Sequence, residues 1–372
     1  MSQNVKKVIA DTFLELANAL ETGNFGAPKI GLMGVGSEHG EAEMCEGAKL
    51  AAGRGVDGVF ISGADEAAAT AEMERMLKSG EIDGAVAMHY TFPIGVATVG
   101  KVTTPATGKA LYIATTTGTS ATDRVAAMVR NAIYGIIAAK ASGVENPTVG
   151  ILNIDGARQV ERALRELADN GYAINFTQSK RSDGGVFMRG NDVLNNPCDV
   201  LVCDSLTGNV LMKLLSSFTT GGCYEATGFG YGPGIGEGAD QLVLIVSRAS
   251  GAPVVAGAME YAAQLVRGGW RKVVAAEFAA AKAAGLADVL AKITDKAAPV
   301  AAEVVAAPPK EVVTAEIAGI EITELDDAVV VLWKAGIYAE SGMGCTGPIV
   351  LVSQANHEKS TQILTEAGYV SE

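Results

Sequence analysis

The sequence predicts a three-layer α/β/α fold with a mainly parallel sheet, plus a small α+β unit at the C-terminal end. Three observations support this prediction. Short apolar segments without polar alternation recur between residues 29 and 246, as expected for strands buried on both faces. Helical segments separate them, which favours parallel strands covered by helices on both sides. Before residue 310 the composition shifts to Ala, Val and Pro, which predicts a linker to a second unit.

The first half of the chain alternates predicted strands and helices. An amphipathic helix is expected within residues 1–20. The strands expected next are 29–33, 56–61, 83–88 and 111–115, and the helices begin near residue 41 and cover 64–78 and 123–141. A glycine at position 143 follows the last helix, as is common at helix C-termini.

The second half repeats the alternation and ends in the small unit. Strands are expected at 148–154, 199–203 and 242–246, with helices at 160–170, from about 209 to 215, and at 257–267. In the C-terminal unit we expect strands at 320–323 and 349–353 and helices at 324–335 and 357–367. The predicted domains are a core of residues 1–275, a helix and Ala/Pro-rich linker of residues 276–309, and a unit of residues 310–372 that is either tethered or packed permanently on the core.

Composition narrows the class of function. The chain has 372 residues, and its net charge of −13, from 29 basic and 42 acidic residues, argues against nucleic-acid binding. No apolar run is long enough to span a membrane, and the N-terminus lacks a signal-peptide pattern. The five cysteines lack the spacing of a disulfide framework, so we expect a cytoplasmic protein.

The sharpest local feature is the segment Gly342-Met-Gly-Cys-Thr-Gly-Pro348. Cys345 is the candidate nucleophile, because a thiolate in a suitable environment is reactive. Glycines on both sides let the main-chain N–H groups of Gly344, Thr346 and Gly347 converge on an anion or an oxyanion. The alternative is a plain glycine turn that contains a small buried thiol. We interpret the other four cysteines as structural; they are Cys45, Cys198, Cys203 and Cys223.

A second candidate site follows the predicted strand 199–203. Ligands of open parallel sheets bind at the carboxyl ends of strands, and helix N-termini favour phosphate. This loop offers Asp204, Ser205, Thr207, Gly208 and Asn209 for binding phosphate or an acyl group. The alternative interpretation is that Ser205, Thr207 and Asn209 only cap the following helix.

Other polar segments carry weaker signals. The turn from Gly34 to Gly40 lacks the third glycine of a dinucleotide-binding loop and the lysine of a P-loop, so we interpret it as a tight turn. His89 and Tyr90 follow the strand 83–88 and could line the same cleft, although an exposed loop histidine is the alternative. No motif indicates a metal or a cofactor.

The middle of the chain resembles the phosphate acyltransferases of bacterial phospholipid synthesis. The matching segments are residues 145–154, Asn175-Phe176 and above all Asp-Val-Leu-Val-Cys-Asp-Ser-Leu-Thr-Gly-Asn-Val at 199–210. The resemblance spans about residues 28–267 and implies a fold like that of isocitrate and isopropylmalate dehydrogenases. It also implies a reaction in which an acyl thioester and phosphate give an acyl phosphate. Ser205-Leu206 replaces the Gly-Phe of that family, and the tail 310–372 has no counterpart there.

The whole chain resembles the alpha subunits of component C of glycine, sarcosine and betaine reductase complexes, most clearly at Gly342–Pro348. That resemblance implies that Cys345 receives an acetyl group from selenoprotein A as a thioester, and that inorganic phosphate releases acetyl phosphate. It also implies a component C beta subunit as partner. Three alternatives remain: a direct phosphate acyltransferase without a covalent step, an oxidoreductase of the isocitrate dehydrogenase type, and a non-catalytic scaffold. No metal-binding carboxylate cluster supports the oxidoreductase.

Overall fold

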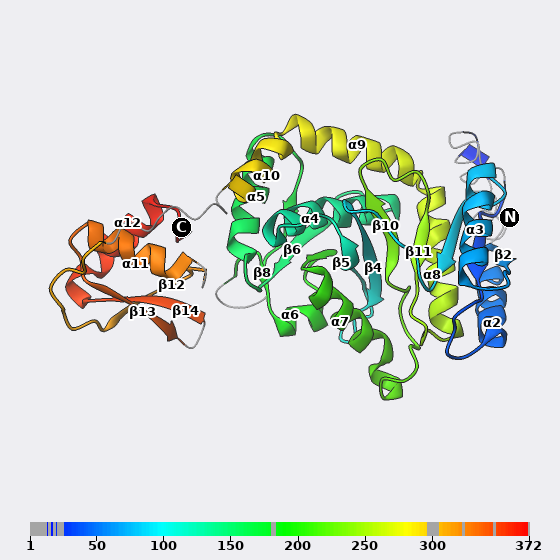
Figure 1. Cartoon of the computed structure of the whole chain (residues 1–372), viewed down its shortest axis with the longest axis horizontal. Coiled ribbons are helices and arrows are strands. Elements are labelled where there is room, and N and C mark those ends of the chain that lie inside the picture. Colours follow the sequence, from blue (N-terminus) through cyan, green and yellow to red (C-terminus); the bar gives the residue numbers. More distant parts are fainter. Residues whose placement is uncertain are drawn as a thin grey trace, which may run out of the picture. The chain divides into compact units, whose positions relative to one another are not determined.

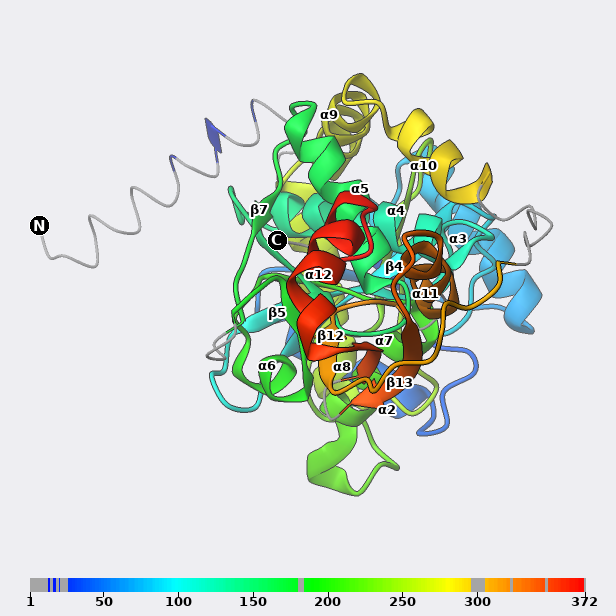
Figure 2. The ribbon, with the colours of Figure 1, turned by 90° about the vertical axis from the view of Figure 1, so that its left-hand side faces the viewer.

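The computed structural model describes residues 13, 16, 17, 20, 26–179, 184–295, 305–321, 324–344 and 347–370. They form two compact units (Figures 1 and 2). The first unit extends to Asn153 and continues from Val160 to Ile293, and the second comprises Ile154–Gln159 with the segment from Thr294 onward. The predicted helix within residues 1–20 lies outside the described residues except at four helical positions.

Among the described residues, eleven strands of the first unit form one sheet. The strand order is β2-β1-β3-β11-β10-β4-β5-β9-β6-β7, and β8 also pairs with β6. The strands are β1 (Lys29–Met33), β2 (Asp57–Ile61), β3 (Gly84–Ala87), β4 (Val96–Thr103), β5 (Ala110–Thr119), β6 (Thr148–Leu152), β7 (Asn175–Phe176), β8 (Phe187–Met188), β9 (Val200–Val202), β10 (Gly232–Gly236) and β11 (Val243–Ile245). Most of these pairs are parallel, which confirms the predicted mainly parallel sheet.

Helices cover both faces of this sheet. They are α2 (Glu41–Ala52), α3 (Glu66–Ser79), α4 (Arg124–Ala141), α5 (Ala157–Asp169), α6 (Gly190–Asn195), α7 (Ser205–Ser217), α8 (Ala252–Arg267), α9 (Trp270–Ala283) and α10 (Leu286–Asp295), with a 3₁₀ turn at Phe218–Thr220. Figure 1 shows α4 and α9 on one side of the central strands and α6 and α7 on the other. The three-layer α/β/α prediction is therefore confirmed.

The sheet reverses direction near its middle, and this positions the candidate sites. Strand β10 is antiparallel to both β11 and β4, and β4 is antiparallel to β5. Strands β1, β2, β3 and β11 therefore run one way, whereas β5, β9 and β6 run the opposite way. The carboxyl ends of the strands in these two groups therefore lie at opposite ends of the sheet, measured along the strand direction.

The second unit contains a three-stranded antiparallel sheet with the order β12-β14-β13. Its strands are β12 (Ala315–Ala318), β13 (Ala339–Gly344) and β14 (Gly347–Val352), and its helices are α11 (Leu325–Lys334), α12 (His357–Glu366) and a 3₁₀ turn at Gln354–Asn356. Apolar side chains of both helices and all three strands share one core, including Ile317, Leu332, Ala339, Val350 and Leu364. The predicted small α+β unit is therefore confirmed.

Several predicted elements need correction. The expected strand 320–323 is wrong, because the strand lies at Ala315–Ala318 and Gly319 follows it with φ of +96°. Ile320 is buried in the core of the unit instead, and positions 322–323 lie outside the described residues. The antiparallel strands β4, β10 and β13 were not predicted. The sequence of β10, Gly-Pro-Gly-Ile-Gly, lacks the β-branched pattern of a strand, whereas β4 has that pattern in Val-Ala-Thr-Val-Gly-Lys-Val-Thr and was missed. The predicted boundary at 275 falls inside α9.

Candidate functional site

The segment with Cys345 joins two paired strands. Gly344 and Gly347 are register partners at the end of the β13–β14 ladder. Cys345 and Thr346 are the two residues between them, and both lie outside the described residues. The glycine-rich segment is therefore not one long loop, because Ser341–Gly344 belong to β13 and Gly347–Pro348 to β14. The alternation of small residues hides this strand in the sequence.

The four other cysteines differ in their environments. Cys198 and Cys203 are buried, and burial raises the pKa of Cys198 to about 12 and the pKa of Cys203 well above the usual thiol range. The sulfur of Cys203 lies 3.7 Å from the carbonyl oxygen of Thr115. Cys45 is partly buried and Cys223 is exposed. Cys198 and Cys203 are thus poor nucleophiles, since the thiolate is the reactive form.

The Asp204 carboxylate caps helix α7. It accepts hydrogen bonds from the backbone N–H of Thr207 at 2.9 Å and from its hydroxyl at 2.8 Å, and it pairs with Arg124 at 3.0 Å. Burial alone would raise the pKa of Asp204, but the Thr207 N–H and the Arg124 guanidinium outweigh it and hold the pKa below its usual range. Asp204 is therefore the residue that caps the helix, whereas Ser205, Thr207 and Asn209, which the alternative interpretation predicted to cap it, lie inside α7.

The rest of this loop packs against β5. Gly208 is buried, and a Cβ atom at this position would lie 1.8 Å from the carbonyl oxygen of Thr115. The side-chain amide of Asn209 donates a hydrogen bond to the carbonyl oxygen of Thr116 at 3.1 Å. Ser205 begins the helix and is partly buried. The structure thus brings all five predicted residues of this loop to the first turn and a half of α7.

His89 and Tyr90 lie at a different edge of the sheet. They follow β3, which four strands separate from β9, so the two strands lie roughly 24 Å apart across the sheet at about 4.8 Å per spacing, and their carboxyl ends also point in opposite directions. His89 is exposed, and the Tyr90 hydroxyl donates to Glu74 at 3.1 Å. The structure therefore does not bring these two residues into a cleft with Asp204. The reversal of the sheet is the physical reason.

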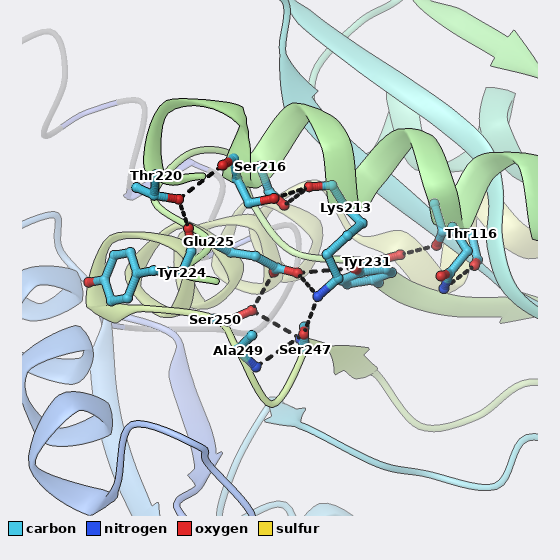
Figure 3. A network of polar contacts seen from close by, with 12 residues as sticks. Thr116, Lys213, Ser216, Thr220, Tyr224, Glu225, Tyr231, Ser247, Ala249 and Ser250 are labelled. Atoms are coloured by element: carbon cyan, nitrogen blue, oxygen red, sulfur yellow. Dashed lines mark hydrogen bonds and ion pairs between the residues drawn. The ribbon is translucent and has the colours of Figure 1, made fainter. Parts of the chain in front are cut away.

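A polar network at the edge where β11 ends was not predicted from the sequence. The ammonium of Lys213, on α7, lies 2.5 Å from a carboxylate oxygen of Glu225 and 2.8 Å from the hydroxyl of Ser247 (Figure 3). Glu225 also accepts hydrogen bonds from Ser250 at 2.7 Å and from the Tyr231 hydroxyl at 3.1 Å. A signal was present, because Lys213 is the single charged residue in the sequence of α7.

The described part of the chain shows neither a metal-binding cluster nor a membrane span. Among the described residues, no three His, Cys, Asp or Glu side chains lie close enough together to hold a metal ion. No helix in the described part of the chain has the length and apolar character needed to span a membrane.

The chain is similar in sequence to a known class of proteins. The sequence profile described as "Fatty acid synthesis protein" matches residues 28–186 and 211–351, so the chain belongs to this family. Over 385 aligned residues it is 56% identical to the glycine/sarcosine/betaine reductase complex component C subunit alpha of Peptoclostridium acidaminophilum, covering 99% of this chain and 100% of that protein.

Shorter matches connect the chain to phosphate acyltransferases. The enzyme of Halothermothrix orenii is 36% identical over 88 residues, which cover 22% of this chain and 24% of that protein. The enzyme of Lacticaseibacillus casei is 27% identical over 157 residues, which cover 37% and 44%. Both resemblances inferred from the sequence are therefore confirmed.

Proposed function

We propose that this chain is an acyltransferase of a reductase complex that carries an acetyl group on Cys345. The Cys345 thiolate attacks the carbonyl carbon of an acetyl group on a selenoprotein carrier, the bond between that carbon and the carrier breaks, the carrier leaves, and the resulting thioester is later released as acetyl phosphate. The observation that supports this proposal most is the similarity along nearly the whole chain to a component C subunit alpha. The likeness to phosphate acyltransferases supports phosphate as the final acyl acceptor.

The release step is chemically simple. An oxygen of inorganic phosphate attacks the thioester carbonyl carbon, the C–S bond breaks, and the Cys345 sulfur leaves as a thiolate. A covalent intermediate divides one difficult transfer into two easier steps. No general base is needed, because phosphate is already an anion. Main-chain N–H groups of Gly344, Thr346 and Gly347 hold the oxyanion of the tetrahedral intermediate in this proposal.

The remaining assignments also belong to the proposal. The loop of Asp204, Ser205, Thr207, Gly208 and Asn209 binds phosphate or the acyl group at the N-terminus of α7. The partners are a component C beta subunit and selenoprotein A, and the protein acts in the cytoplasm. The burial of Cys198 and Cys203 favours Cys345 as the nucleophile, because their raised pKa values leave little thiolate.

Two other functions make different demands on Cys345. A direct phosphate acyltransferase transfers the acyl group to phosphate without a covalent step, and the partial matches to that enzyme class favour it. A non-catalytic scaffold needs no nucleophile at all. Direct transfer and a scaffold role would both persist without the Cys345 thiol, whereas the covalent mechanism would be lost.

The test compares Cys345→Ala with Cys223→Ser, a change at an exposed thiol. Incubation with acetyl-labelled carrier and partner subunits should label the wild type and Cys223→Ser but not Cys345→Ala, and only the labelled proteins should form acetyl phosphate. Asn209→Ala should slow release by phosphate more than formation of the thioester. Normal turnover by Cys345→Ala would show that the covalent mechanism is wrong.

A further inference from the structure

The polar network around Lys213 stands where two neighbouring parallel strands end. Ala87 of β3 and Ile245 of β11 are register partners, and the N–H of Val246 continues the ladder to the Ala87 carbonyl at 2.9 Å. Ser247 follows the last paired residue of β11 by two positions. Carboxyl ends of parallel strands are the usual place for ligands in open α/β sheets.

The ion pair in this network is asymmetric. The side chain of Glu225 is 1% exposed, whereas that of Lys213 is 40% exposed. The carboxylate is fixed from three sides, because Ser250 and the Tyr231 hydroxyl also donate to it. A buried carboxylate paired with an exposed ammonium contributes little net stability, since its desolvation offsets the attraction. What the arrangement does achieve is to fix the position of the ammonium.

Lys213 keeps part of its hydrogen-bonding capacity. A lysine ammonium has three N–H donors. Within the described part of the chain, two of them are used, toward Glu225 and Ser247. Figure 3 shows the side chain extending from α7 to these two groups, which come from different loops. A donor held in place before a ligand arrives loses little freedom on binding an anion.

We propose that Lys213 binds inorganic phosphate beside the carboxyl end of β11, and that Glu225 is a positioning residue for Lys213. This inference rests on the proposed function for the choice of phosphate as the anion. It places phosphate about two turns further along α7 than the Asp204 loop, roughly 12 Å at 1.5 Å per residue from Ser205. The Asp204 loop is then left with the acyl group or with capping alone.

The chain offers a matched control for Lys213. Lys140 lies 2.6 Å from Glu277, a nearly buried carboxylate that also accepts a hydrogen bond from the Tyr172 hydroxyl at 3.0 Å. The two pairs have the same chemistry. Lys140, however, lies in the last turn of α4 and pairs with a residue of α9, whereas Lys213 also bonds to Ser247, which follows β11. Inorganic phosphate should therefore protect Lys213 from chemical modification but not Lys140.

The first experiment is reductive methylation of the whole chain with formaldehyde and cyanoborohydride, followed by peptide mass spectrometry. Inorganic phosphate should slow methylation of Lys213 at least fivefold relative to chloride at equal ionic strength, and Lys140 should react at the same rate in both. Equal rates at Lys213 in both salts would overturn the inference.

The second experiment measures phosphate binding by ³¹P NMR line broadening. Lys213→Met combined with Glu225→Gln avoids an unpaired buried charge and should raise the phosphate concentration for half-saturation at least tenfold. Lys213→Arg, which keeps the charge, should raise it less. Lys140→Met combined with Glu277→Gln should stay within twofold of the wild type. Far-ultraviolet circular dichroism confirms that each variant is folded.

The Lys213 phosphate site and the Cys345 thioester can be refuted independently of each other, because neither experiment on Lys213 needs an acyl donor or Cys345. Phosphate protection that persists in Cys345→Ala supports the Lys213 site whatever the fate of the thioester. If Ser205→Ala and Asn209→Ala abolish phosphate binding and the Lys213 double variant does not, phosphate belongs to the Asp204 loop and this inference is wrong.

Discussion

Gly344 and Gly347 lie opposite each other at the end of the β13–β14 ladder, so the chain between them is Cys345 and Thr346 alone. The hairpin itself is anchored in the second unit, because Ala339, Val350 and Val352 belong to its core. The candidate nucleophile thus belongs to a segment whose two ends are fixed by strand pairing.

The first prediction concerns alkylation of the folded protein by iodoacetamide. Cys198 and Cys203 should stay unmodified until the protein unfolds, because both are buried and their pKa values are raised. Cys223 is exposed and should react, so the measurement uses the Cys223→Ser protein. Loss of activity should then follow modification of Cys345, as read by peptide mass spectrometry. Full activity of a protein completely alkylated at Cys345 would favour a scaffold or a direct transfer.

A second prediction addresses the packing of α7 on the sheet. Gly208→Ala should lower the free energy of unfolding by about 1–3 kcal/mol, because the added Cβ would lie 1.8 Å from the backbone carbonyl of Thr115. Urea denaturation measures the loss. Gly190→Ala, at the start of α6, is the control, since nothing lies within 4 Å of its added Cβ. Equal stability of the two variants would contradict the close approach of α7 to β5.

A third prediction concerns Lys101, which is 6% exposed and surrounded by aromatic rings. Its ammonium donates to Gln264 at 2.8 Å and lies 4.5 Å from the ring centre of Phe229, 5.2 Å from that of Tyr261 and 5.6 Å from that of Tyr112. Burial lowers the pKa of Lys101 from 10.5 to about 8, and the charge of Glu260 acts in the opposite direction.

The unfolded chain therefore binds more protons than the native state between pH 8 and pH 10.5, so this residue makes stability rise with pH in that window. The whole shift corresponds to roughly 3 kcal/mol. Relative to Lys101→Met, the wild type should gain stability as the pH rises from 8 to 10, measured by chemical denaturation at each pH. Lys109→Met, at an exposed position, should show no such difference from the wild type. A pH-independent difference for Lys101→Met would refute the assignment.

Local sequence was sufficient for several features of the molecule. Runs of apolar residues predicted most parallel strands, and the helix after Asp204 was predicted from about residue 209, although it begins at Ser205. Cys203 was correctly interpreted as a structural thiol. These features depend on burial and capping, which neighbouring residues encode directly.

Only the tertiary structure decided which segments meet. His89 and Asp204 each follow a strand, yet they lie at opposite ends of the sheet, because the antiparallel pairing of β10 and β4 reverses the strand direction between β3 and β9. The pair of Lys213 and Glu225 and the aromatic surroundings of Lys101 also join residues from separate elements. Hydrophobic periodicity determines which face of a strand is buried, whereas strand order and direction depend on long-range pairing that no local pattern specifies.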